Sequence, residues 1–295
     1  MIQEAPLCEE RFIVAKDLRD YLAMAPSTFG DLMKREIVEY IPKAKSQQRS
    51  RYLATTEVKK ILTSTSHDFT SKTERITVHV SKGGVGKSTS TYFLASRLAS
   101  LGFSTLVIDA DAQGNISQAF SPFLKDTRHE LNDKTPVLID LIKPDGVTAA
   151  EAIIPITNTL HLLPSTPNNC TIDRWIDSVS PNQSLFFSKI LGTIESQYHF
   201  IFIDCAPSFS LINGCAMSYA DILLAPTMLD SFSIMSLSQT IADADSLQEA
   251  FKGSGPHDIQ LLVCQYDARL TKSNATALSA LTTNYHDLLL PSMIR

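Results

Sequence analysis

The glycine-rich stretch at residues 81–89, SKGGVGKST, constrains the fold of this chain more than any other feature. It follows a run typical of a buried strand, residues 76–80, and precedes a helix-forming run, residues 90–101. Three glycines let the backbone turn tightly, so that successive N–H groups and the positive end of the following helix can surround phosphate oxygens. In such a loop Lys87 reaches the terminal phosphates and Ser88 binds Mg²⁺. A plain glycine turn between a strand and a helix is the alternative.

The loop departs from the strict P-loop pattern G-x-x-x-x-G-K-[ST] at its first position, where Ser81 replaces glycine. A second lysine, Lys82, follows it, and K-G-G-x-G-K-[ST]-[ST] resembles the deviant Walker A motif of the ParA/MinD ATPases. The resemblance implies that the loop binds ATP and that Lys82 has a catalytic role at the nucleotide of a partner subunit. The ATP-binding residues that it implies are Gly83, Gly84, Val85, Gly86, Lys87, Ser88 and Thr89.

A second polar segment follows residues 104–109, STLVID, which have the pattern of a buried strand. Carboxylates and amides at the carboxyl end of a strand face the crevice in which open α/β sheets bind ligands. The segment at 109–115, DADAQGN, resembles the ParA motif I-D-x-D-P-Q-G-N, with Ala112 in place of proline. By that resemblance Asp111 is catalytic and orients the attacking water. Asp109 is equally consistent with a purely structural role.

A third motif closes the run YHFIFID at residues 198–204. An aspartate after a row of apolar residues is the pattern of a Walker B strand, and the following residues resemble the I-D-x-x-P-S of the same family. The resemblance implies that Asp204 holds Mg²⁺ through water, opposite Ser88. Cys205 is predicted to be a small buried residue rather than a reactive thiol.

Strand-like and helix-like runs continue to alternate in the second half of the chain. This alternation predicts an α/β fold, a mainly parallel twisted sheet with helices on both faces. The expected helices are 184–196, 211–219, 233–251 and 274–285, and the expected strands are 221–225 and 259–263. The proline-rich span 121–183 indicates only a short helix near 137–142 and a strand at 160–163.

Composition narrows the class of protein. A chain of 295 residues that is 44% hydrophobic and 19% charged is ordinary for a globular protein. No apolar run approaches the roughly 20 residues that cross a bilayer, and the first residues lack a signal-peptide profile, so we expect a cytoplasmic protein with no membrane partner. The five cysteines lack C-x-x-C spacing, which argues against a zinc site or a disulfide framework.

Charge is unevenly distributed along the chain. The net charge is −5, but residues 1–75 carry a net +2 and residues 76–295 a net −7. A positive segment joined to an acidic body suggests two modules with different partners. We therefore expect a DNA-binding domain at 1–70, a linker at 71–75 and an ATPase domain at 76–295. ParA proteins continue beyond the final apolar run, and by comparison the carboxyl end here is expected to be truncated.

The first module has helical periodicity. Apolar spacing predicts one helix over 14–24 and a second that is capped by Ser27 or Thr28 and ends near Arg35, which together make a helix-turn-helix candidate. A basic stretch resembling a wing precedes a third helical run at 51–61, capped by Thr55 or Thr56. This order resembles the MerR-like winged helix-turn-helix of the larger plasmid ParA proteins; a three-helix protein-interaction module is the alternative. The candidate DNA-binding residues are Ser27, Thr28, Lys34, Arg35, Lys43, Lys45, Arg49 and Arg51.

These resemblances together imply a ParA-type partition ATPase that uses ATP and Mg²⁺. Such a protein forms a homodimer on ATP, binds DNA non-specifically, and is reset when a centromere-binding ParB-type partner stimulates hydrolysis. Its amino-terminal module would bind an operator and repress its own operon, and the protein would be associated with the nucleoid. Two alternatives remain: a repressor that senses nucleotide without motor activity, and a MinD-like regulator of cell division.

Overall fold

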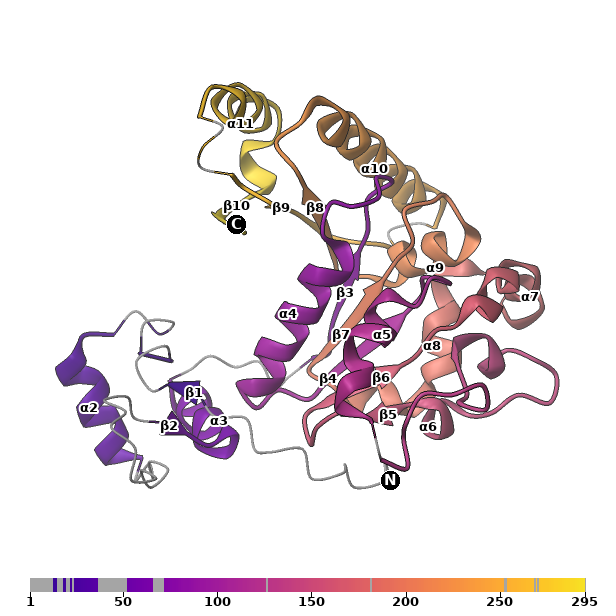
Figure 1. Cartoon of the computed structure of the whole chain (residues 1–295), viewed down its shortest axis with the longest axis horizontal. Helices are drawn as coiled ribbons and strands as arrows, with labels where there is room; N and C mark the ends of the chain where they lie inside the picture. The colour runs from indigo at the N-terminus through magenta and orange to yellow at the C-terminus, as the bar shows by residue number, and fades with distance from the viewer. Residues whose placement is uncertain are drawn as a thin grey trace.

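The computed structural model describes residues 13–14, 18–19, 22, 24–36, 52–65, 72–125, 127–180, 182–251, 254–267, 269 and 271–294. Residues 74–293 contain an eight-stranded sheet, and the amino-terminal part contains a two-stranded one (Figure 1). The order of the large sheet is β10-β9-β8-β3-β7-β4-β6-β5. Every pairing in it is parallel except the short β5–β6 pair at one edge. The predicted mainly parallel sheet is therefore confirmed.

The central strands of the large sheet are short and deeply buried. Both β4 and β7 are buried at all five positions, which explains why their sequences are nearly continuous apolar runs. Their bounds are β3 Glu74–Val78, β4 Thr105–Asp109, β5 Ile154–Pro155, β6 Leu160–Leu163, β7 Phe200–Asp204, β8 Ile222–Thr227, β9 Asp258–Val263 and β10 Leu289–Met293.

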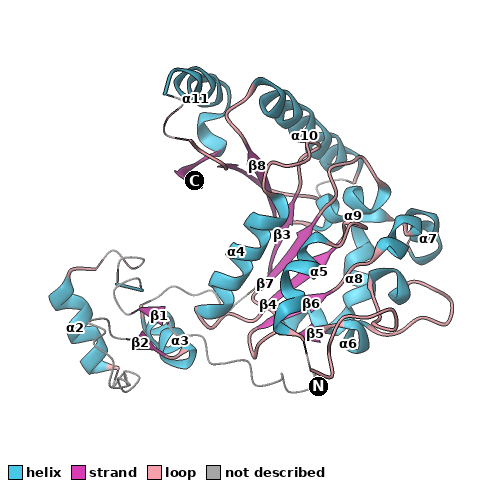
Figure 2. Cartoon of the chain, in the orientation of Figure 1, coloured by secondary structure: helices cyan, strands magenta, loops and turns pink. Residues whose placement is uncertain are grey.

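Helices cover both faces of this sheet. Successive strand residues point to opposite sides, and apolar residues on each side pack against helices. Val107 and Phe202 belong to the apolar cluster that includes residues of α4, whereas Leu106 and Ile201 belong to the cluster that includes residues of α8 and α9. Figure 2 shows the helices around the strands, with α10 and α11 beside β8–β10. The helices are α4 Lys87–Ser100, α5 Asn115–Phe120, α6 Ala149–Ala152, α7 Asp173–Val179, α8 Phe186–Leu191, α9 Leu211–Tyr219, α10 Ser231–Ala250 and α11 Thr271–Tyr285.

The middle of the chain contains more structure than its sequence indicates. The expected helix near 137–142 is a 3₁₀ helix, Leu138–Leu141, and the expected strand at 160–163 is β6. Helices α5, α6 and α7 and strand β5 were not predicted. Two of these helices have fewer than seven residues, which is too short for a periodic pattern. The other 3₁₀ helices are Ser121–Phe123, Pro167–Thr171, Gln183–Leu185, Gly192–Gln197 and His286–Leu288.

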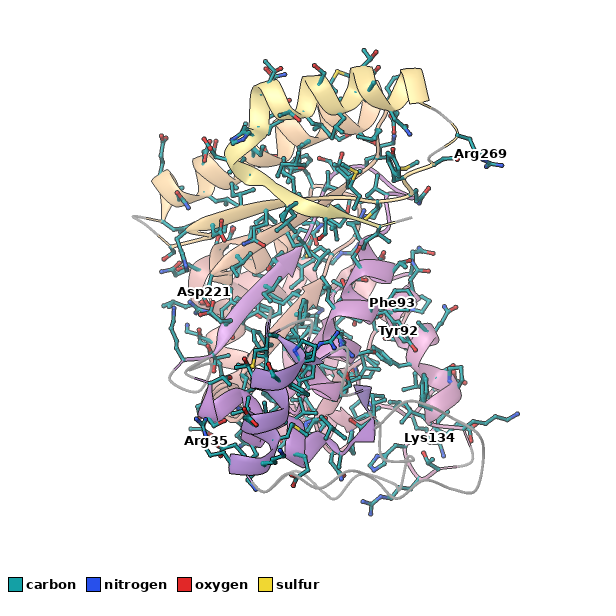
Figure 3. The ribbon with its side chains drawn as sticks, turned by 90° about the vertical axis from the view of Figure 1, so that its left-hand side faces the viewer. Arg35, Tyr92, Phe93, Lys134, Asp221 and Arg269 are labelled. Carbon is teal, nitrogen blue, oxygen red and sulfur yellow. The ribbon has the colours of Figure 1, made fainter. Side chains whose placement is uncertain are left out.

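Strand β3 begins inside the predicted linker 71–75. The backbone N–H and guanidinium of Arg75 donate to the Asp221 carboxylate at 2.8 to 3.0 Å, and the Asp221 N–H donates to the Arg75 carbonyl. These bonds fix the amino end of β3 beside β8, so Glu74 and Arg75 belong to the sheet. Figure 3 shows Asp221 at this end of the sheet.

In the amino-terminal part, β1 Ile13–Val14 pairs antiparallel with β2 Tyr52–Leu53. Helix α2 covers Pro26–Arg35 and α3 covers Thr55–Ser64. Val14 and Tyr52 were expected in helices, and strand pairing places them in this small sheet instead. Leu18 and Arg19 are helical, in agreement with the first predicted helix.

The predicted helix caps in this part are wrong. Helix α2 has Ala25 at its N-cap and Pro26 inside its first turn, so Ser27 and Thr28 are already helical. Proline suits the first helical position because its missing N–H has no partner there in any case. Helix α3 likewise has Ala54 at its N-cap, without a side-chain cap, so Thr55 and Thr56 are also helical.

Candidate nucleotide site

Three neighbouring strands of the sheet bring the predicted site residues to one edge. Val78 at the end of β3 is in register with Asp204 at the end of β7, and Asp204 is in register with Asp109 at the end of β4. The carboxyl ends of these strands are therefore level, which is where open α/β sheets bind ligands. The glycine-rich loop after β3 consequently lies close to both aspartate motifs.

The glycine-rich loop adopts the conformation that its glycines permit. Gly84 and Gly86 have φ values of 76° and 95°, and Gly86 is the N-cap of α4. Side chains disfavour these angles, so glycine is required for the turn. The loop borders a cavity of about 540 Å³, lined by Gly83, Gly84, Gly86, Lys87, Ser88 and Thr89. Val85 is buried, so its side chain does not face the cavity.

The Lys87 ammonium is folded back along its own loop. Its Nζ donates to the carbonyl oxygens of Val80 and Lys82 at 3.2 and 2.7 Å. Burial lowers the pKa of Lys87, while the nearby carboxylates of Asp204 and Asp111 act in the opposite direction. A cation held by two carbonyl oxygens of its own loop is positioned to meet an anion that enters the loop.

Asp204 has the properties of a cation ligand. Its Oδ1 accepts a hydrogen bond from Thr91 Oγ1 at 3.1 Å, whereas its buried Oδ2 has no partner among the residues that the structure describes. Burial raises the pKa of Asp204 to about 6, although the nearby hydroxyls of Ser88 and Thr91 lower it in part. A buried carboxylate oxygen without a partner is costly, and a divalent cation would satisfy it. Ser88 and Asp204 therefore fit Mg²⁺ chemically.

A cation here would need additional ligands. Among the described ranges, no three His, Cys, Asp or Glu side chains form a metal-ligand group. Mg²⁺ is usually held by one or two protein groups together with phosphate oxygens and water, so two protein groups suffice when a nucleotide is present.

The two aspartates after β4 differ in their surroundings. Asp109 is fully buried, and its carboxylate accepts hydrogen bonds from the N–H and Oγ of Ser117 at 3.0 and 2.6 Å. Burial raises the pKa of Asp109 to about 8. Asp111 lines the cavity, and its carboxylate accepts the N–H of Gln113 at 2.8 Å. The geometry thus gives Asp109 a structural position and Asp111 access to a ligand.

Lys82, the second lysine of the loop, lies in a different environment from Lys87. Its Nζ donates to both carboxylate oxygens of Asp230 at 2.8 and 2.9 Å and to Ser233 Oγ at 2.9 Å. Asp230 is the N-cap of α10 and accepts the N–H groups of Phe232 and Ser233. Although partial burial acts to raise it, hydrogen bonds from Lys82 and Ser233 hold the pKa of Asp230 at about 2.

Sequence reasoning missed four residues that shape the site. Thr91 and Ser233 are common polar residues on helices, and nothing in their spacing marks them. Asp230 does carry a signal, because an aspartate just before a helical run is a typical N-cap. Gln265, which follows β9, donates a hydrogen bond of 2.8 Å to the Gly84 carbonyl. The two residues are 181 positions apart in the sequence.

The predicted DNA-binding residues of helix α2 share one face. Ser27, Thr28, Lys34 and Arg35 are exposed, and Figure 3 labels Arg35, whereas Phe29, Leu32 and Met33 are buried on the other side. Lys34 and Arg35 also have acidic neighbours in Asp31 and Glu36. The remaining candidates, Lys43, Lys45, Arg49 and Arg51, lie outside the described residues.

The comparison with known proteins agrees with this geometry. The AAA domain family AAA_31 matches residues 73–254, from just before β3 to just after α10. The chain belongs to this AAA domain family. The match contains the glycine-rich loop, both aspartate motifs and the Lys82–Asp230 pair.

Curated proteins whose names state a role are also similar to the chain. The cell division protein PomZ of Myxococcus xanthus is 29% identical over 217 residues, which are 72% of this chain and 64% of PomZ. The chromosome-partitioning ATPase Soj of Treponema pallidum is 27% identical, over 72% of this chain and 79% of Soj. The match to PomZ and to the Myxococcus xanthus partitioning protein ParA spans less than two thirds of the length of each relative.

Solved structures share the fold of this chain. Apo McdA from Cyanothece superposes with a TM-score of 0.65 at 25% identity, covering 76% of this chain and 86% of McdA. A Borrelia burgdorferi plasmid partition protein bound to AMPPNP gives a TM-score of 0.62 at 25% identity, covering 76% of this chain and 86% of that one. Within the part of the chain that the structure describes, no helix is both long and apolar enough to span a membrane.

Proposed function

We propose that this protein is a Mg²⁺-dependent ATPase of the ParA type that positions or segregates DNA. The observation that carries the proposal is the meeting of three groups at one edge of the sheet: Lys87 in the loop, Asp204 with its unpartnered Oδ2, and Asp111 at the cavity. A loop that binds anions, a cation ligand and a second carboxylate are the parts that phosphoryl transfer to water requires.

Each part has a separate task in ATP hydrolysis. The loop N–H groups and Lys87 hold the phosphates, and Ser88 and Asp204 hold the cation. Mg²⁺, when bound with ATP, offsets the negative charge that develops on the phosphates. Asp111 accepts a hydrogen bond from the attacking water and orients it. Asp109 and Ser117 keep the segment after β4 in place, so that Asp111 remains at the cavity.

We further propose that ATP binding produces a homodimer in which Lys82 reaches the nucleotide of the partner. Exposed apolar side chains near Lys82 support this. Phe232 and Met235 at the start of α10 are 72% and 65% exposed, and Phe209, two residues after the Pro207 that borders the cavity, is 60% exposed. Exposed large apolar side chains are candidates for an interaction surface, and each of these lies within two residues of a group that contacts Lys82 or borders the cavity.

Two alanine variants test the nucleotide and dimer roles separately. Lys87→Ala is expected to abolish detectable ATP binding and turnover. Lys82→Ala is expected to retain nucleotide affinity but to remain monomeric with ATP in light scattering. Lys134→Ala, an exposed lysine away from the loop, is the matched control. If Lys82→Ala dimerises with ATP as the wild type does, the proposal that Lys82 contacts the nucleotide of the partner subunit is wrong.

DNA is the proposed partner of both modules. The ATP-bound dimer would bind DNA non-specifically, a ParB-type centromere-binding protein would stimulate hydrolysis, and the amino-terminal module would recognise an operator and repress its own operon. The exposed polar and basic face of α2 supports operator binding.

The deciding measurement is ATP turnover with and without DNA and a candidate centromere-binding protein. Stimulated turnover supports the partition cycle. A chain that binds ATP and protects an operator but never turns over ATP would be a nucleotide-sensing repressor. Recruitment to lipid vesicles with ATP would favour a MinD-like regulator of cell division.

A further inference from the structure

Gln265, two residues after the carboxyl end of β9, has an unusual backbone conformation. Its φ is 56°, and it is the one non-glycine residue with a positive φ among those that the structure describes. A glutamine in this region costs conformational energy and persists only when its surroundings hold it there. Such residues concentrate at ligand sites.

The side chain of Gln265 reaches the phosphate loop. Its Nε2 donates to the Gly84 carbonyl at 2.8 Å, and the residue lines the same cavity as the loop. Gly84 has a φ of 76°, so without an anchor its neighbouring peptide groups would be free to rotate. One hydrogen bond therefore joins Gln265, whose backbone is strained, to Gly84, the glycine whose backbone can rotate most freely.

The residue before Gln265 contacts the same loop. A Cβ placed on Gly86 would lie 3.6 Å from both Cβ and Sγ of Cys264, and Cys264 Sγ lies 3.5 Å from Ser90 Oγ. Cys264 and Gln265 thus contact the loop at two successive glycines, with Cys264 packing and Gln265 donating a hydrogen bond.

Residues on both sides of Gln265 are held by the segment after β10. The Ile294 N–H donates to the Val263 carbonyl at 2.8 Å, and the Tyr266 N–H donates to the Ile294 carbonyl at 3.0 Å. These two bonds bridge Cys264 and Gln265 and keep the positive φ in place. The backbone on both sides of Gln265 is therefore held by the segment after β10, in addition to the contact of its side chain with the loop.

From this arrangement we infer that Gln265 is a positioning residue for the phosphate loop. The carbonyl of Gly84 and the N–H of Val85 belong to one planar peptide group and point in opposite directions. By holding the carbonyl, Gln265 fixes the direction of the Val85 N–H, which is the group through which Val85 can bind a phosphate. The same bond keeps a carbonyl oxygen from turning toward the anionic phosphates. This inference rests on the proposed nucleotide binding.

Two substitutions separate the hydrogen bond from the backbone strain. Gln265→Asn keeps the amide and tolerates a positive φ better, but its side chain is one methylene too short to reach Gly84. Gln265→Glu keeps the length but turns a carboxylate oxygen toward the carbonyl. Gln239→Asn, at an exposed glutamine of α10 whose Nε2 donates to Asp243, is the matched control.

The experiment measures the Kd for a fluorescent ATP analogue with Mg²⁺ together with the melting temperature without nucleotide. Gln265→Asn should raise Kd about three- to tenfold, the effect of one lost hydrogen bond, without lowering the melting temperature. Gln265→Glu should raise Kd further, and Gln239→Asn should change neither quantity.

The outcomes distinguish this inference from the proposed function. If the wild type binds the analogue and both Gln265 variants bind it equally well, the positioning role is wrong and the proposed function stands. If Gln265→Asn lowers the melting temperature and leaves Kd unchanged, Gln265 is merely structural. If the wild type binds no nucleotide, the proposed function and the positioning role both fail.

Discussion

Lys82 and Asp230 form an ion pair within one chain, with Lys82 Nζ 2.8 and 2.9 Å from the two carboxylate oxygens. The same ammonium also donates to Ser233. The lysine that we propose to act on a partner's nucleotide therefore already has an intramolecular partner at the start of α10. Dimer formation must exchange these contacts for contacts with phosphate, so the pair competes with the dimer.

Asp230→Asn should favour the ATP-bound dimer. Asparagine caps a helix about as well as aspartate, so α10 keeps its start while Lys82 loses the negative charge. Because the pair is partly exposed, we expect the dimer dissociation constant with ATP to fall about two- to fivefold. Analytical ultracentrifugation over a concentration series measures it. Asp245→Asn, at an exposed position of the same helix, is the control, and a weaker dimer in Asp230→Asn would contradict competition.

Asp204→Asn should weaken cation binding without destabilising the fold. The amide keeps the shape of the side chain and removes a charge that burial disfavours, so the melting temperature without ligand should stay the same or rise. The enhancement of ATP affinity by Mg²⁺ should disappear, because the oxygen that fits the cation is lost. Titrations of ATP with Mg²⁺ and with EDTA measure this. A variant that keeps the full Mg²⁺ effect would show that Asp204 is not a ligand.

The parallel sheet and most of the site could be predicted because both depend on local patterns. Fully buried parallel strands require continuous apolar runs, and an aspartate that ends such a run lies at the carboxyl edge of the sheet. This reasoning predicted Asp111 and Asp204 near the carboxyl edge of the sheet, where Asp204 ends β7 and Asp111 lines the cavity. It could not separate the roles of Asp109 and Asp111, because only the structure shows that Ser117 donates two hydrogen bonds to the Asp109 carboxylate.

The parts that the sequence did not predict depend on distant contacts. Asp230 is 148 positions from Lys82, and Gln265 is 181 positions from Gly84, so no periodicity connects them. The amino-terminal helix boundaries were misplaced for a different reason. Threonine and serine are preferred caps, but Ala25 and Ala54 occupy the N-cap positions without any side-chain bond.

Operator binding by α2 predicts a specific salt dependence. If Lys34 and Arg35 each neutralise a phosphate, replacing both with alanine should lower the slope of log K against log salt by about two. Fluorescence anisotropy with upstream DNA at several salt concentrations measures the slope. The pair Lys134→Ala and Arg269→Ala removes two exposed charges elsewhere (Figure 3) and serves as the control. Equal slopes for the α2 variant and the wild type would refute the assignment.

Asp221 forms ion pairs with Arg75 and Lys72 at the end of the sheet away from the nucleotide site. These ion pairs should make the stability of the folded protein depend on pH in the acidic range. The Asp221 side chain is 4% exposed, and although burial acts to raise its pKa, hydrogen bonds from Arg75 and Lys72 lower that pKa from 3.8 to about 2. A carboxylate with a lower pKa in the folded state contributes stability above the unfolded value, and this contribution disappears as pH falls toward 2.

Asp221→Asn should therefore destabilise the protein by about 1 to 2 kcal/mol at pH 7, less than the full shift implies because Arg75 and Lys72 remain partly exposed to water. The loss should be constant from pH 7 to about pH 5 and should shrink as pH falls below about 4. Urea unfolding of the wild type and the variant over this range measures the difference. Asp258→Asn, on the neighbouring strand β9, is the control. A difference that grew on acidification would contradict the assignment of the lowered pKa to Asp221.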